Sequence, residues 1–342
     1  MAAIKLNFAL PSSLNATTPP ERRGVRRDHV RMMEINRFTG AISHDDFYNL
    51  ANYLKPGDLI VLNNSRTIPA ILYAQLERES AAAGPKVQIR LAHRKSKEIW
   101  EVQIVSDDVR IGDVFSFSSG LTAEVIERKM DSPFSILCFS KGGQELLNEI
   151  YRIGEPVRYE YISTPWNLDY YQTVFASVPG SVEMPSAGRA FSWELLFKLQ
   201  KKGINIAYLQ LHTGLSYLLD DKWHIGPDEN LEEYKIPQQT MDSVLRTKGD
   251  GGRIIAAGTT VVRALETAVA SQKLQGWTNL YIDSSYELKL VDGIITGFHE
   301  PEASHLDMLS AFIQKEQLFK AYQQAVEEKY LWHEFGDVNL IL

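Results

Sequence analysis

The chain has 342 residues, and its 36 Lys and Arg residues against 43 Asp and Glu residues give a formal net charge of −7. This acidic balance argues against a protein that binds nucleic acid through overall charge, although it allows a local basic patch. The single cysteine, Cys138, excludes an intramolecular disulfide and a Cys-x-x-Cys metal site, and its apolar neighbours predict a buried thiol. The N-terminal segment lacks the apolar core of a signal peptide, and no apolar run approaches ~18 residues, so we expect a cytoplasmic protein.

The first 40 residues are predicted to be irregular, and they contain the densest basic run of the chain. Five arginines lie between residues 22 and 31. In an acidic protein this run is either a solvated loop or a surface that contacts phosphate groups. On the second interpretation, RNA is contacted by Arg22, Arg23, Arg26 and Arg27. The polar residues at 43–46 then predict the start of a helix that ends at Pro56-Gly57.

Residues 58–140 consist of short β-type runs with turn residues between them. Several of these runs alternate apolar and polar residues, which is typical of half-buried strands. The predicted strands are 59–63, 70–76, 86–93, 99–105, 113–117, 121–127 and 134–139. Because no helix separates them, they predict a small antiparallel barrel or sandwich. A helix is expected next, over 144–153.

After Pro165 the pattern becomes mixed α/β. Ser192 predicts the cap of a helix that ends at Gly203, and a strand over 204–211 follows. The remaining predicted elements are a strand–turn–helix unit over 251–268, strands near 279–283, 286–290 and 293–298, a long helix over 304–328 and a strand over 338–342. We therefore predict an α/β main domain, residues 1–66 and 152–342, with an inserted antiparallel β-barrel domain, residues 67–151.

Three predicted strands end in polar tips: His212-Thr213-Gly214, Gly258-Thr259-Thr260 and Phe298-His299. In α/β sheets, ligands bind outside the carboxyl ends of the strands, so the three tips could form one site. The helix start after Gly258 offers free N–H groups that favour an anionic or polar ligand atom, although a plain capped βα turn would look the same. The small-residue loop 180–188 either lines this site or is a surface connection. A zinc site has little support, because no His-x-x-x-His or His-Glu-x-x-His motif occurs.

Nine stretches, taken in order, carry a family resemblance. They are PGDLIVLNNSRTIPA (56–70), YQTVFA (171–176), PSAG (185–188), LHTGL (211–215), GGRIIAAGTTVVRALE (251–266), GWTNLYI (276–282), VDGIITGFHEP (291–301), DMLSAF (307–312) and FGDVNLIL (335–342). Along nearly its whole length, the chain resembles the S-adenosylmethionine:tRNA ribosyltransferase-isomerases of queuosine biosynthesis. The resemblance implies an α/β domain with an inserted β-barrel, as predicted from the pattern.

The resemblance also implies a reaction. The family transfers and isomerises the ribosyl moiety of S-adenosylmethionine onto 7-aminomethyl-7-deazaguanine in tRNA, giving epoxyqueuosine-tRNA and releasing adenine and methionine. His212 or His299 would be the base that removes a proton next to the sulfonium, and Arg263 would hold a carboxylate or phosphate. Other matched positions implied to bind substrate are Arg66, Gln172, Ser186, Gly188, Gly214, Glu233, Tyr234, Gly258, Thr259, Thr260, Glu266 and Asp337. No metal is implied, since the sulfonium already activates the donor, and we favour a monomer that binds tRNA and no membrane.

Some positions depart from the family pattern. Ala190 stands where the family has histidine, Glu302 stands where it has lysine, and residues 283–285 replace a Tyr-Pro-Gly sequence. These changes motivate an alternative hypothesis. In it, the chain is a divergent paralogue that has lost the activity and binds another small molecule or acts as a non-catalytic binding module. A generic hydrolase has little support, because the chain lacks a Gly-x-Ser-x-Gly motif.

Overall fold

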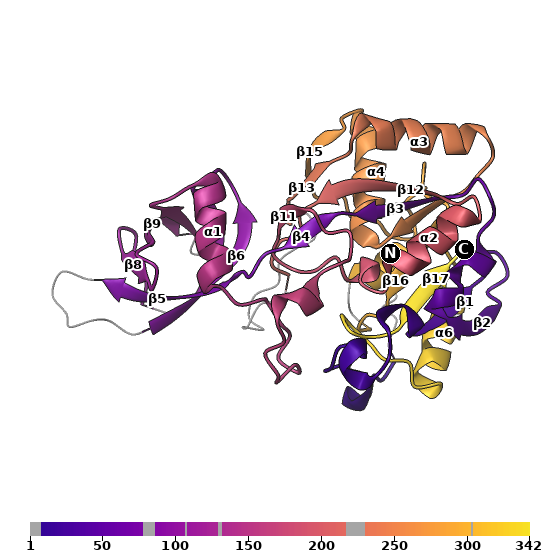
Figure 1. The fold of residues 1–342 in the computed structure, drawn as a ribbon, viewed down its shortest axis with the longest axis horizontal. Helices are drawn as coiled ribbons and strands as arrows, with labels where there is room; N and C mark the ends of the chain where they lie inside the picture. The colour runs from indigo at the N-terminus through magenta and orange to yellow at the C-terminus, as the bar shows by residue number, and fades with distance from the viewer. Residues whose placement is uncertain (1–7, 78–85, 107, 129–131, 217–229, 302–303) are drawn as a thin grey trace.

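The computed structural model describes residues 8–77, 86–106, 108–128, 132–216, 230–301 and 304–342. Figure 1 shows a β-barrel at one end of the molecule and a larger α/β part at the other. A short parallel pair, β4 (Ser65–Thr67) and β11 (Val178–Ser181), lies where the two parts meet. This arrangement confirms the predicted fold class, a mixed α/β main part with an antiparallel barrel.

The main part is built on a mixed nine-stranded sheet in the order β15-β13-β12-β3-β14-β16-β17-β1-β2. Its strands are β1 (Arg31–Ile35), β2 (Ile42–Asp46), β3 (Leu59–Asn63), β12 (Asn205–Leu211), β13 (Glu232–Lys235), β14 (Ile254–Ala257), β15 (Gln275–Thr278), β16 (Gly293–Gly297) and β17 (Val338–Ile341). The central strands β12, β3, β14 and β16 are parallel neighbours. Their carboxyl ends therefore meet at one edge of the sheet.

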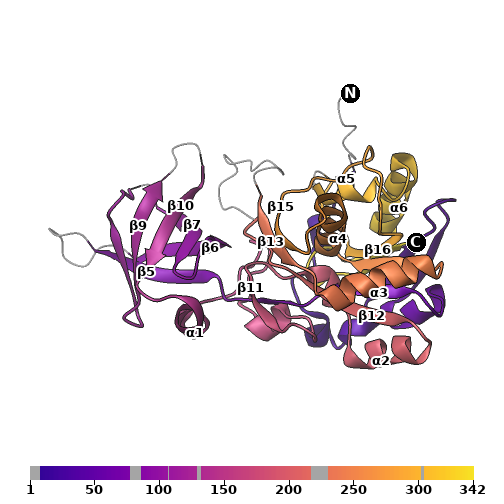
Figure 2. The same ribbon diagram turned by 90° about the horizontal axis from the view of Figure 1, so that it is seen from above.

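Helices cover both faces of this sheet, because each face is apolar. They are α2 (Trp193–Lys201), α3 (Gln238–Gly249), α4 (Thr259–Ser271), α5 (Ser304–Leu309) and α6 (Lys315–Glu327). Figure 2 shows α4, α5 and α6 on one side of the sheet and α2 on the other. One core therefore includes Leu265 and Tyr322, and the opposite core includes Leu195 and Leu199. As predicted, Ser192 caps α2, since its Oγ accepts the N–H of Leu195 at 3.0 Å.

The barrel closes in the order β10-β7-β6-β5-β8-β9, and all neighbouring strands are antiparallel. Its strands are β5 (Ile71–Glu77), β6 (Lys86–Arg94), β7 (Ile99–Val105), β8 (Val114–Phe117), β9 (Thr122–Arg128) and β10 (Phe134–Phe139). Helix α1 (Gly143–Ile153) packs Leu146 and Ile150 into the same core as Trp100. Cys138 is half-buried rather than buried, because it lies on the outward-facing side of β10. The domain boundaries at residues 66/67 and 151/152 stay a prediction.

Several predicted elements are wrong. The helix over 304–328 is two helices, since Gln314 is extended (φ −60°, ψ 140°) and the segment before it buries Phe312 and Ile313. The region of residues 42–54 is strand β2 followed by a 3-10 helix, Phe47–Tyr53, and the predicted irregular start contains strand β1.

No strand forms over 279–283 or 286–290. The Asp283 carboxylate accepts the N–H of Ser285 at 2.9 Å, which closes a turn there. The Glu266 carboxylate accepts the N–H groups of residues 289–291, the donors that a strand would give to its neighbour. Within the described ranges, the structure contains no helix that is long and apolar enough to cross a membrane.

Candidate functional site

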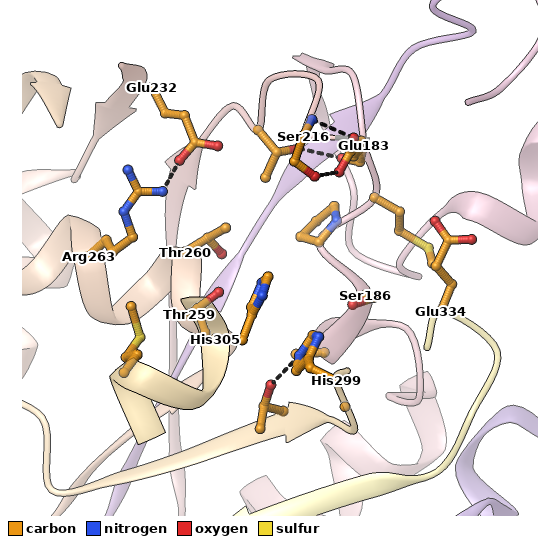
Figure 3. A pocket seen from close by; sticks show the side chains of 18 of the residues that line it. Glu183, Ser186, Ser216, Glu232, Thr259, Thr260, Arg263, His299, His305 and Glu334 are labelled. Carbon is orange, nitrogen blue, oxygen red and sulfur yellow. Dashed lines mark hydrogen bonds and ion pairs between the residues drawn. The ribbon is translucent and has the colours of Figure 1, made fainter. Parts of the chain in front are cut away.

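A cavity of about 400 Å³ lies at the carboxyl ends of the central strands. Thr213 follows β12, Gly258 follows β14, and His299 follows β16; all three line it. The structure thus brings the three predicted polar tips together. Figure 3 shows the threonines of α4, the histidines and Ser186 around the same space. Seven predicted site residues line the cavity: Ser186, Gly214, Gly258, Thr259, Thr260, Arg263 and His299.

The amino-terminal end of α4 forms one wall of the cavity. The N-cap is Gly258, with φ +100°, a conformation that favours glycine, and a Cβ there would lie 3.2 Å from the Cβ of Ala187. Glycine supplies no capping side chain, so the first turn of α4 presents backbone N–H groups and the Thr259 and Thr260 side chains to the cavity. Residues 183–187 also line the cavity, so the small-residue loop lines the site rather than merely connecting elements.

Arg263 also lines the cavity, but its guanidinium binds the chain itself. Nη1 forms an ion pair with Glu232, and Nε donates to the carbonyl of Leu280 at 3.2 Å. Nη2 donates to the carbonyls of Asn230 (3.4 Å) and Thr278 (3.3 Å). The guanidinium therefore links the segments around residues 230–232 and 278–280 at the edge of the cavity, and little of its hydrogen-bonding capacity is left for a ligand.

The two candidate histidines differ in position. His299 lies in the cavity, with Nε2 3.3 Å from Thr296 Oγ1, and burial holds its pKa well below the ordinary range. His212 lies behind the cavity, where its Nδ1 is 2.6 Å from Ser65 Oγ and its ring packs against Gly180. Burial lowers the pKa of His212 to about 4. Both imidazoles are neutral at pH 7, and only that of His299 lines the cavity.

Comparison with known proteins identifies the family. A family model described as "Queuosine biosynthesis protein" matches residues 4–341. The chain belongs to this family. It is 36% identical over 340 residues to a protein of Aquifex aeolicus named S-adenosylmethionine:tRNA ribosyltransferase-isomerase, covering 99% of both chains. It is 33% identical over 350 residues to a protein of the same name from Halothermothrix orenii, covering 100% of both. The crystal structure of the Thermotoga maritima S-adenosylmethionine tRNA ribosyltransferase is similar, with a TM-score of 0.55 at 32% identity over 98% of this chain and 99% of that one.

Several positions matched to this queuosine family lie outside the cavity and bind backbone groups. The buried carboxylate of Glu266 accepts three consecutive N–H groups at 2.9–3.1 Å. Asp337 accepts the N–H groups of Arg31 (2.9 Å) and Leu331 (2.7 Å). Gln172 accepts the N–H of Thr67 at 3.1 Å and donates to its carbonyl at 2.8 Å. These side chains hold segments in place.

Four other matched positions also lie away from the cavity lining. The Tyr234 hydroxyl donates to the carbonyl of Lys273 at 2.9 Å. Glu233 pairs with Arg94 at 3.3 Å. Gly188 packs against Phe175 and Thr173, and Arg66 is exposed, with its guanidinium 5.9 Å from the centre of the Tyr151 ring. A substrate role for these residues stays a prediction.

The four arginines predicted to contact RNA are held by the chain. Arg22 donates to the Tyr170 hydroxyl at 2.6 Å, and Arg23 donates to the carbonyl of Phe335 at 3.0 Å. Arg26 pairs with Asp28 at 3.0 Å and Glu194 at 2.5 Å, while Arg27 pairs with Glu21 at 3.0 Å. Arg22 and Arg26 are nevertheless exposed, so contact between these two residues and RNA stays a prediction.

Other cavity residues were not singled out from the sequence. His305 stacks on His299, and Glu232 holds Arg263. Glu183 accepts the Ser216 N–H at 2.7 Å. Burial, together with Glu183, raises the pKa of Glu334 to about 8. No sequence motif marks these residues: His305 lies in α5, Glu232 lies in the short strand β13, and Glu183 and Glu334 lie in loops. Among the described residues, no group of three or more His, Cys, Asp or Glu side chains could hold a metal ion.

Where the structure describes them, the departures from the family pattern do not line the cavity. Ala190 is buried in the core beneath α2, with Phe191 and Leu195. Asp283 forms the turn described above. Glu302 lies outside the described residues. The departures at Ala190 and Asp283 therefore change packing and a turn rather than the lining of the cavity.

Proposed function

We propose that this protein transfers and isomerises the ribosyl moiety of S-adenosylmethionine onto 7-aminomethyl-7-deazaguanine in tRNA. The products are epoxyqueuosine-tRNA, adenine and methionine. The observation that carries this proposal is the cavity, which joins a neutral histidine to a helix amino terminus in a chain of the queuosine family. The volume of about 400 Å³ lies within the range of small-molecule sites.

The reaction needs a base next to the sulfonium, and His299 is the better candidate. A neutral imidazole takes the proton from the carbon beside the sulfur: the C–H bond breaks, an N–H bond forms, and the electron pair stays on carbon. His212 lies behind the cavity and bonds to Ser65, so its position favours a structural role. S-adenosylmethionine is a substrate here, and this chemistry requires no metal.

The charges around the cavity suit a cationic donor. Glu183 and Glu300 line it, while the charge of Arg263 is opposed by Glu232. S-adenosylmethionine carries a sulfonium and an ammonium group, and carboxylates nearby favour both. The amino-terminal end of α4 complements the donor's carboxylate.

The partner is tRNA that carries the precursor base, and the reaction belongs in the cytoplasm, where tRNA is modified. The exposed Arg22 and Arg26 are the candidate phosphate contacts. We favour a monomer, because a single chain contains every residue to which the proposal gives a role in the reaction.

The test is release of adenine from S-adenosylmethionine by the purified protein in the presence of tRNA bearing 7-aminomethyl-7-deazaguanine. The control is the same tRNA with guanine at that position. Adenine release with only the first tRNA supports the proposal, and His299→Gln should abolish it. No release at saturating substrate would refute the proposal and favour the non-catalytic paralogue. Release with both tRNAs would refute the assigned acceptor.

A further inference from the structure

Two imidazole rings are stacked in the cavity. The ring centroids of His299 and His305 are 3.9 Å apart, and the planes differ by 8°. His299 follows β16, whereas His305 lies in the first turn of α5, so two separate elements bring the rings together. Figure 3 shows both between Thr259 and Ser186. A parallel contact this close is a specific arrangement, and the family reaction as proposed above uses only one of the two rings.

We infer that His305 is a positioning residue for His299, stacked so that the two imidazoles form a unit that accepts a single proton. This inference rests on the proposed function, in which His299 is the base. It assigns a role to a residue that the sequence comparison leaves without one.

The geometry restrains His299 in two directions. Thr296 Oγ1 lies 3.3 Å from Nε2 and fixes the ring edge, while the His305 face fixes the ring plane. When Nε2–H donates to Thr296, the lone pair that accepts the substrate proton is on Nδ1. A base held in one orientation loses no freedom when the substrate arrives.

Burial and the neighbouring groups explain why the two rings accept only one proton between them. Burial keeps both rings neutral, and it lowers the pKa of His305 to about 4. The other charged or titratable groups that act on the rings are His333 on His299, and Glu300 and Arg263 on His305. After proton transfer, the imidazolium faces a neutral aromatic ring, which is favourable. A second proton would place two cations 3.9 Å apart, which is strongly unfavourable.

The experiment compares His305→Ala, which removes the stacked ring, with His305→Phe, which keeps a flat ring without titratable nitrogens. We expect kcat to fall about 10–100-fold in His305→Ala with little change in KM, because the base loses its orientation. His305→Phe should lose less, and the acid limb of its pH profile should move to higher pH, because residue 305 can then no longer be protonated and repel a proton on His299. His44→Phe, a histidine bonded to Tyr330 outside the cavity lining, is the control and should change neither.

Two results would overturn the inference. The first is a kcat within about twofold of wild type in both His305 variants with an unmoved acid limb. The second is a rise in KM alone, which would make His305 a binding residue. NMR titration of the His299 ring in the substrate-free protein separates this test from the proposed function. A higher His299 pKa in His305→Phe supports the coupling even if the wild type releases no adenine, whereas an unchanged pKa refutes it. The NMR test also stands if His305→Ala does not fold.

Discussion

Replacing Arg263 tests whether its guanidinium serves the fold or the ligand. The Arg263 and Glu232 side chains are 15% and 5% exposed, so Arg263→Met leaves a buried carboxylate without its cation. Breaking a buried pair from one side costs about 3–5 kcal/mol in free energy of unfolding. The double variant Arg263→Met/Glu232→Met removes both charges and should recover all but about 1–2 kcal/mol.

Urea unfolding of the single and double variants measures these free energies, and calorimetric titration with S-adenosylmethionine measures binding. The next pair along β13, Glu233 with Arg94, is 43% and 39% exposed and supplies a matched control. Arg94→Met should cost only about 0–1 kcal/mol. The opposite result would be a loss of less than about 1 kcal/mol in Arg263→Met, together with a loss of S-adenosylmethionine binding that the double variant does not recover. Arg263 would then contact the ligand, and the interpretation that its guanidinium serves the fold would be wrong.

Three further substitutions follow from the same structure. Glu266→Ala should lower the free energy of unfolding by about 3–6 kcal/mol and speed hydrogen exchange at residues 289–291, because three N–H groups lose their acceptor. Unchanged exchange would contradict the conclusion that Glu266 holds this segment in place. Glu334 has a folded-state pKa raised from 4.5 to about 8, so wild-type stability should fall as the pH rises between these values. Glu334→Gln should remove this slope and be about 1–3 kcal/mol more stable than wild type at pH 8, as measured by unfolding at each pH; equal slopes would refute the shift. Gly214→Ala should cost about 1–3 kcal/mol in thermal unfolding, since its Cβ would lie 2.0 Å from His93 Nε2; an unchanged midpoint would show that His93 moves freely.

Much of the fold follows from local pattern. Strands Leu59–Asn63, Ile99–Val105 and Phe134–Phe139 have the predicted bounds, because apolar runs or alternation end at turn residues. The long helix failed for a tertiary reason: Phe312 and Ile313 enter the core between α5 and α6, and helical periodicity does not encode that break. Local pattern therefore predicts elements whose ends are marked by turn chemistry, and it misses ends that are set by packing.

The candidate site divides in the same way. The rule that ligands bind at the carboxyl ends of parallel strands predicted that His299 and the turn after Gly258 would share a site, because these ends lie at one edge of the sheet. It also predicted His212, which follows a neighbouring strand but turns toward Ser65 instead. The rule identifies which edge carries the site, but it does not determine on which side of that edge each side chain lies. His305 was missed because only the packing of α5 brings it onto His299.

Glu232 and Glu233 show that the register of one short strand, which the sequence does not encode, can decide which residue belongs to the site. Family resemblance favoured Glu233, but in the register of β13 Glu232 lies opposite Thr278 and points toward Arg263. Glu233 points to the other face and pairs with Arg94 of the barrel. Successive residues of a strand face opposite sides, so a shift of one residue would exchange these two roles. β13 has only four residues, two of them adjacent glutamates, so its pattern does not encode which face is buried. The pairing with β12 and β15 sets that register, and it thereby decides which glutamate forms the wall of the cavity.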